Sequence, residues 1–189
     1  MNGNGLLRQA MTLALVAGLC GIILGAAYTT TKPRIDFIKD EELKNSLTQV
    51  LPEASDFTLR NAPGNQTYFA GYAGDKFVGY AFTVESAGYS SVIEVLVGVD
   101  GDGTVLGAKV LGQQETPGLG ARIAEVRVGE DKPWFMAQFE GKRGVHLRLS
   151  KYGGSVDAIT GATVSSTAVS EGLFKGVSDM MEVIEADGL

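Results

Sequence analysis

The sequence is poor in the two residues that most often bind zinc and iron–sulfur clusters. Its 189 residues include one cysteine, Cys20, and one histidine, His146. A single cysteine excludes an intrachain disulfide and every cysteine-ligated iron–sulfur or zinc arrangement, and a single histidine excludes a histidine cluster. We therefore expect no metal site, and any redox chemistry would need an organic cofactor.

Positive charge is also scarce. The 16 Lys and Arg residues are outnumbered by 22 Asp and Glu, which gives a formal net charge of −6. No Lys/Arg cluster is present that could neutralise consecutive phosphates, so nucleic acid is not an expected partner. Hydrophobic residues make up 44% of the chain, which is enough for the core of one ordinary domain plus an appendage.

A stretch near the amino terminus carries no charge. No charged residue lies between Arg8 and Lys32, and a helix of this length measures roughly 34 Å, against a hydrocarbon core of roughly 30 Å. We predict a short tail over residues 1–8 and a transmembrane helix over residues 9–31. Two alternatives remain, a cleaved signal peptide ending near Ala27 and a lipoprotein signal at Cys20.

Small residues recur along one side of this predicted helix. Ala17, Gly21 and Gly25 are spaced four apart, which lets two helix backbones approach closely in lipid. The spacing favours docking against other membrane proteins of a complex, although glycine and alanine are common in membrane helices in any case. Basic residues flank both ends, so the positive-inside rule does not decide the orientation.

The remainder, residues 32–189, is predicted to be one α+β domain in which helices flank an antiparallel sheet. The Asp-Gly pairs of residues 100–103 predict a tight hairpin, and Val145, Leu147 and Leu149 alternate with polar neighbours, which places His146 on a polar face. Apolar spacing predicts helices over residues 35–51, 132–139 and 165–184, and strand-like runs over residues 67–72, 76–85, 91–99 and 104–111.

Two segments differ from these regular elements. Residues 112–120 contain three glycines and a proline, which predicts a shaped loop whose backbone N–H groups can approach a flat ligand, or else an ordinary surface loop. Residues 157–163 end in Thr163, directly before the long carboxyl-terminal helix. The N–H groups at a helix start can bind a phosphate, whereas the ordinary role of threonine or serine at this place is helix capping.

In combination, the two segments resemble the hallmark motifs of the FMN-binding domain family. The whole chain, with its predicted anchor, is similar to the G-subunit family of Rnf ion-translocating ferredoxin:NAD⁺ oxidoreductases, and more distantly to the C-subunit family of the Na⁺-translocating NADH:quinone oxidoreductases. The flavin acceptor motif is matched by Asp157, Thr160, Gly161, Ala162 and Thr163, and the second loop by Glu115, Thr116, Gly118, Leu119 and Gly120.

The resemblance implies an electron carrier without catalytic residues of its own. FMN would be attached through its phosphate to Thr163 by a separate flavin transferase, which would recognise Asp157. Thr163 is favoured over Thr160 because it directly precedes the helix, where the dipole stabilises an anion by typically about 0.3–1 kcal/mol. The loop from Glu115 to Gly120 would contact the ring, with Glu115 either hydrogen-bonded to it or capping the loop.

The resemblance also implies partners and a location. The chain would be a single-pass component of the Rnf complex in the inner cell membrane, docked on other membrane subunits, with its domain outside the cytoplasm. Two alternatives remain: a component like the C-type flavoprotein of a Na⁺-pumping NADH:quinone oxidoreductase, or a flavin-free, membrane-tethered assembly module.

Overall fold

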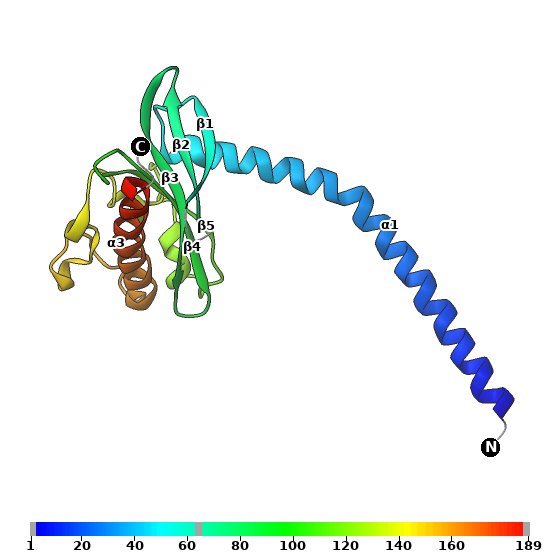
Figure 1. Cartoon of the computed structure of the whole chain (residues 1–189). Coiled ribbons are helices and arrows are strands. Elements are labelled where there is room, and N and C mark those ends of the chain that lie inside the picture. Colours follow the sequence, from blue (N-terminus) through cyan, green and yellow to red (C-terminus); the bar gives the residue numbers. More distant parts are fainter. Residues whose placement is uncertain (1–2, 63–65, 187–189) are drawn as a thin grey trace. The chain divides into compact units, whose positions relative to one another are not determined.

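The computed structural model describes residues 3–62 and 66–186, and within the first helix it describes only some of the side chains before residue 41. The chain divides into two compact units, residues 1–44 and residues 45–189. Helix α1 (Gly3–Val50) is continuous (Figure 1), whereas the sequence predicts a membrane span and a separate amphipathic helix. Among the side chains that are described, no helix combines the length and apolar character needed to cross a membrane, so the predicted span over residues 9–31 is not confirmed.

The second unit is built on a five-stranded antiparallel sheet. Its strands follow one another in chain order, so each hairpin joins two neighbours in the sheet. The strands are β1 (Asp56–Ala62), β2 (Gln66–Ala73), β3 (Lys76–Ala87), β4 (Val92–Val99) and β5 (Val105–Gly112). The predicted α+β class and the four predicted strands are confirmed, and the turn at residues 100–103 joins β4 to β5. The first strand, β1, was not predicted.

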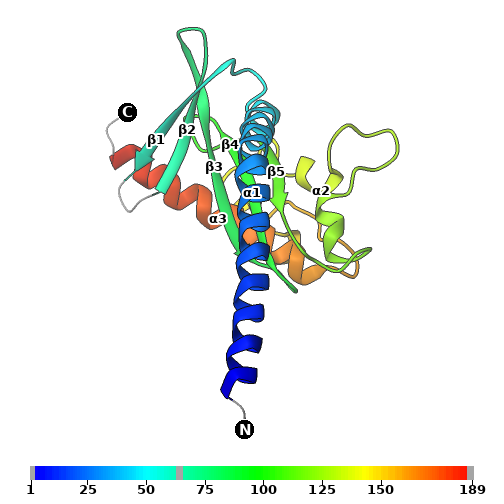
Figure 2. The ribbon, with the colours of Figure 1, turned by 90° about the vertical axis from the view of Figure 1, so that its right-hand side faces the viewer.

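One face of the sheet is covered by helix α3 (Thr163–Ala186) (Figures 1 and 2). The helix turns Val169, Leu173 and Val177 into the same core that receives Val95 and Val97 of β4. These positions are spaced four apart on the helix and two apart on the strand, so each element contributes one apolar face. The long carboxyl-terminal helix predicted from the sequence is confirmed.

Short helices fill the connection between β5 and α3. They are η1 (Gly120–Ala124), α2 (Trp134–Ala137), η2 (Gly144–Leu147) and η3 (Ser150–Tyr152). The helix predicted over residues 132–139 is confirmed only over Trp134–Ala137, as α2, and the predicted segment buries Phe135 and Phe139 completely. The alternation predicted over residues 144–149 is wrong in part: η2 replaces an extended segment and leaves Val145 exposed beside His146, while Leu147 and Leu149 are buried.

The end of α1 packs against the opposite face of the sheet, at a row of glycines. A Cβ added to Gly98 of β4 would lie 2.3 Å from the Val50 carbonyl oxygen, and one added to Gly107 of β5 would lie 2.8 Å from the Val50 Cα. A Cβ on Gly71 of β2 would lie 2.9 Å from Leu51. The chain can approach the sheet this closely only because these positions have no side chain.

This contact predicts that Gly98→Ala destabilises the second unit. The added methyl group must displace the Val50 backbone, and overpacking of this kind typically costs about 1–3 kcal/mol. Urea unfolding of the purified chain measures the change. Gly101→Ala is the matched control, because a Cβ there meets nothing within 4 Å. Equal unfolding midpoints for the two variants would contradict the account.

Candidate functional site

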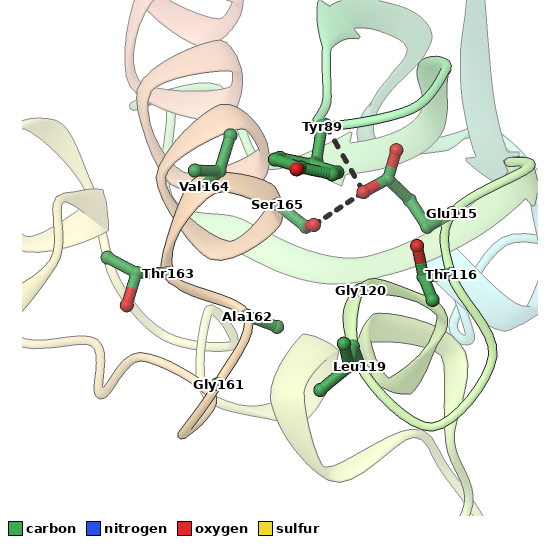
Figure 3. Close-up of a pocket in the computed structure, with 10 residues that line it drawn as sticks. All are labelled: Tyr89, Glu115, Thr116, Leu119, Gly120, Gly161, Ala162, Thr163, Val164 and Ser165. Atoms are coloured by element: carbon green, nitrogen blue, oxygen red, sulfur yellow. Dashed lines mark hydrogen bonds between the residues drawn. The ribbon is translucent and has the colours of Figure 1, made fainter.

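A pocket of about 420 Å³ lies where the loop before η1 meets the first turn of α3 (Figure 3). It brings together most of the predicted site residues from two segments that are distant in sequence. Three predicted residues, Gly118, Asp157 and Thr160, do not line it. The lining residues are Tyr89, Glu115, Thr116, Leu119, Gly120, Gly161, Ala162, Thr163, Val164 and Ser165.

A tight turn delivers the chain to the pocket edge just before α3. The Ala162 N–H donates to the Ile159 carbonyl oxygen at 3.0 Å, and Gly161 inside this turn has a φ of 81°. That conformation favours glycine, and a Cβ here would also approach Leu119 to 3.3 Å. Gly161 therefore lets the turn lie close to the loop on the other side of the pocket.

Thr163 is the first residue of α3 and its side chain is exposed. The carbonyl of Ala162 accepts the first helical bond, from the Ser166 N–H at 3.0 Å, so Ala162 occupies the capping position. Alanine has no side-chain acceptor, and the first N–H groups of a helix have no partner within it. The helix thus presents uncapped donors beside the Thr163 hydroxyl.

The two serines after Thr163 do not cap the helix in the ordinary way. The Ser166 hydroxyl accepts the Ile159 N–H at 3.0 Å and donates to the Ala162 carbonyl at 2.9 Å. Ser166 lies in α3, so these bonds stabilise the turn that precedes the helix. The Ser165 hydroxyl instead donates across the pocket wall to Glu115 Oε2 at 2.5 Å. Ser166 thus joins the turn to the helix, and Ser165 joins the helix to the loop that carries Glu115.

The Glu115 side chain is buried, with only 5% of the residue surface exposed. Its Oε1 accepts the N–H groups of Ser90 at 2.9 Å and Ser91 at 3.0 Å. Its Oε2 accepts the Tyr89 N–H at 3.2 Å as well as the Ser165 hydroxyl (Figure 3). Donors from the β3–β4 turn and from α3 thus converge on one carboxylate, which favours the loop-capping role over a hydrogen bond to a ring.

Two glycines make room for this carboxylate. A Cβ on Gly88 would lie 2.6 Å from Glu115 Oε1, and a Cβ on Gly120 would lie 2.6 Å from Oε2 and 2.5 Å from the Ser165 hydroxyl. Any larger residue at either position would therefore separate Glu115 from its donors. Gly120, which the sequence predicts as a cofactor contact, has this steric role in the structure.

The hydrogen bonds also control the ionisation of Glu115. Burial acts to raise the pKa of its carboxyl group, but the bonds from Ser165 and from the N–H groups of Ser90, Ser91 and Tyr89 outweigh burial and hold the pKa below its usual value. Glu115 is therefore an anion at neutral pH.

The predicted residues outside the pocket are exposed, and two of them lie in turns. Asp157 accepts the Ser150 hydroxyl at 3.2 Å, and its N–H donates to the Gln138 side chain at 2.9 Å. Thr160 is exposed in the turn before α3. Gly118 is also exposed and has a φ of 75°. The role of Asp157 in transferase recognition stays a prediction.

Sequence reasoning missed Tyr89, Val164 and Ser165 as lining residues. Tyr89 lies in the β3–β4 turn, and no motif marks it. Ser165 is one of several hydroxyl residues at a helix start, so capping accounts for it without any pocket. Only the contact with Glu115, 50 residues away, distinguishes its role.

Comparison with known proteins agrees with this geometry. Residues 88–178, which include both walls of the pocket, match the FMN-binding domain family. The fold also resembles the crystal structure of the C-type component of the Na⁺-translocating NADH-quinone reductase from Parabacteroides distasonis, with 26% identity and a TM-score of 0.53 over 69% of this chain and 78% of that one. The second unit therefore contains an FMN-binding domain.

The relatives extend over nearly the whole chain. The G-type component of the ion-translocating oxidoreductase complex of Methanosarcina acetivorans is 32% identical over 90% of this chain and 92% of its own. Its counterpart in the proton-translocating ferredoxin:NAD⁺ oxidoreductase complex of Clostridium ljungdahlii is 31% identical over 94% and 92%. The chain belongs to the G-subunit family of ion-translocating oxidoreductase complexes, as its resemblance to Rnf proteins predicts.

The depressed pKa of Glu115 predicts a specific loss of stability in acid. A carboxyl group whose pKa is lower in the folded state contributes stability above its unfolded value, about 4.5, and this is lost as the pH falls through the folded pKa. We expect wild type to unfold at higher temperature than Glu115→Gln at about pH 7, with the difference shrinking in acid as Glu115 becomes neutral. Thermal unfolding across the pH range measures it. A difference independent of pH would contradict this origin.

Proposed function

We propose that this chain is an electron-carrier subunit with FMN joined covalently through a phosphoester to Thr163. The observation that carries the proposal is the place of Thr163, an exposed hydroxyl on the first turn of α3 that lines the pocket shared with the 115–120 loop. The proposed complex is an ion-translocating ferredoxin:NAD⁺ oxidoreductase of the Rnf type, in line with the relatives' names.

The described residues fit FMN at both of its ends. The uncapped N–H groups at the start of α3 suit a phosphate next to Thr163, because the helix dipole favours negative charge there. The pocket volume of about 420 Å³ lies within the range of small-molecule sites, roughly 300–1,000 Å³. Leu119, Ala162 and Val164 give the pocket apolar walls of the kind that suit a flat ring.

Bound FMN supplies reversible electron uptake that no side chain of this protein offers. The residues of the chain hold and enclose it. Gly161 keeps the turn close to Leu119, and Ser166 pins that turn to α3, so the attachment point is fixed. We further propose that the flavin transferase recognises Asp157, which is exposed shortly before α3.

A fluorescent gel band tests the attachment. The chain is produced together with a flavin transferase and run on a denaturing gel, where only covalent flavin stays with the protein. We expect Thr163→Ala to lose the fluorescence completely, because no other hydroxyl lies at the first position of α3. Thr160→Ala, the matched control in the same turn, keeps the band.

Several outcomes would contradict this proposal. A dark wild-type band from cells that contain an active transferase would support a flavin-free assembly module instead. A band lost in Thr160→Ala and kept in Thr163→Ala would move the attachment to the turn. Purification with quinone reductase activity would favour the C-type component of a Na⁺-pumping NADH:quinone oxidoreductase, whose fold this chain shares.

We also propose that residues 9–31 anchor the chain in the inner membrane, with residues 32–189 outside the cytoplasm and other subunits docked on the anchor. The uncharged run between Arg8 and Lys32 supports the anchor. Mass spectrometry of the chain from membranes is expected to find the amino terminus intact, and protease added to intact spheroplasts is expected to cleave the domain. A mature chain lacking residues 1–27 would contradict the anchor.

A further inference from the structure

Glu115 is the only charged side chain among the ten described residues that line the Thr163 pocket. The other lining residues are glycine, apolar residues, hydroxyl residues and a tyrosine. Among the side chains that line the pocket, this carboxylate is therefore the main source of an electrostatic effect on a ligand. Its backbone lies in the loop that forms the wall of the pocket opposite the first turn of α3 (Figure 3).

The negative charge of Glu115 is stabilised by neutral hydrogen-bond donors and not by a cation. Its donors are the N–H groups of Tyr89, Ser90 and Ser91 and the hydroxyls of Ser91 and Ser165, all of which are neutral. By contrast, Glu125, Glu140 and Glu171 each form an ion pair with a basic side chain. Hydrogen bonds stabilise the anion, but they leave its net charge of one unit in the wall.

A net charge that is buried acts strongly on nearby groups. Coulomb energies between charges are larger in the protein interior than in water, and bulk salt screens them less. A fixed negative charge opposes the arrival of an electron at a neighbouring group. Charge placed near a flavin ring is one of the means by which a protein sets its reduction potential.

We propose that Glu115 is a positioning and tuning residue, a buried carboxylate in the pocket wall that lowers the reduction potential of the flavin. It does so without hydrogen-bonding to the ring, because both carboxylate oxygens are occupied by donors from the β3–β4 turn and α3. The inference rests on the proposed function, since it requires FMN in this pocket.

Redox titration of the full chain carrying covalent flavin tests the inference. Glu115→Gln removes the charge at almost constant volume, so we expect its midpoint potential to be more positive than that of wild type. Glu115→Asp keeps the charge and shortens the side chain, so its potential is expected to stay nearer to that of wild type. Glu125→Gln removes an exposed charge outside the pocket and is expected to leave the potential unchanged.

The Ser165→Ala variant distinguishes an effect of the Glu115 charge on the potential from an effect of pocket shape. It keeps the carboxylate and removes one donor, so the anion is less compensated and the potential is expected to be equal to or below that of wild type. If Glu115→Gln does not fold, the Ser165→Ala variant decides. A more positive potential in Ser165→Ala would mean that loosening of the pocket, not charge, controls the flavin, and the inference would be wrong.

The other outcomes are equally distinct. A Glu115→Gln protein that folds, keeps its flavin and shows an unchanged or more negative potential overturns the inference while leaving the proposed function intact. A wild-type chain without flavin, produced with an active transferase, contradicts the proposed function itself. Flavin content from absorbance is therefore measured on every variant before its titration.

Discussion

The buried carboxylate of Glu115 is the interaction on which the candidate site depends. It joins a turn 24–26 residues before it to a helix residue 50 residues after it, so three segments with no local reason to meet are held at one point. A buried charge without partners would be strongly destabilising. The buried carboxylate is therefore stable only with these donors. Gly88 and Gly120 are required because a side chain at either position would push the carboxylate away from its donors.

The rest of the fold supplies a rigid base for this contact. Helix α3 packs its apolar face on the sheet along Val169, Leu173 and Val177, which fixes its first turn relative to β3 and β4. Thr163 thereby lies on a helix that is packed on the sheet. The opposite wall of the pocket lies on a loop that is fixed by the hydrogen bonds of Glu115. A site built partly on a packed helix is held more precisely than one built from loops alone.

Much of the fold could be predicted from local patterns, and the failures have physical causes. The strands β2 to β5 alternate or run apolar and are separated by turn residues, whereas β1 is an edge strand whose side chains are mostly exposed. The alternation at Val145, Leu147 and Leu149 is typical of an extended segment, but η2 forms there and only the last two are buried. A short pattern of this kind is compatible with more than one backbone.

The site was predictable to a similar extent. Thr163 and the 115–120 loop carry their own motifs, and the pocket unites them. Ser165 and Tyr89 carry no such signal, because their importance comes from a partner far away in sequence. The charge of Glu115 was visible in the sequence, but its burial and its donors were not. Contacts of long sequence separation are the information that local patterns lack.

The proposed function depends on Thr163 as the residue that carries the flavin. Fragmentation mass spectrometry of the tryptic peptide 152–175, taken from chain produced with its transferase, tests it most directly, because Thr160, Thr163 and Thr167 all lie in this peptide. We expect the added mass of an FMN phosphoester on Thr163 alone. An unmodified peptide, or flavin localised to any other residue, would contradict it.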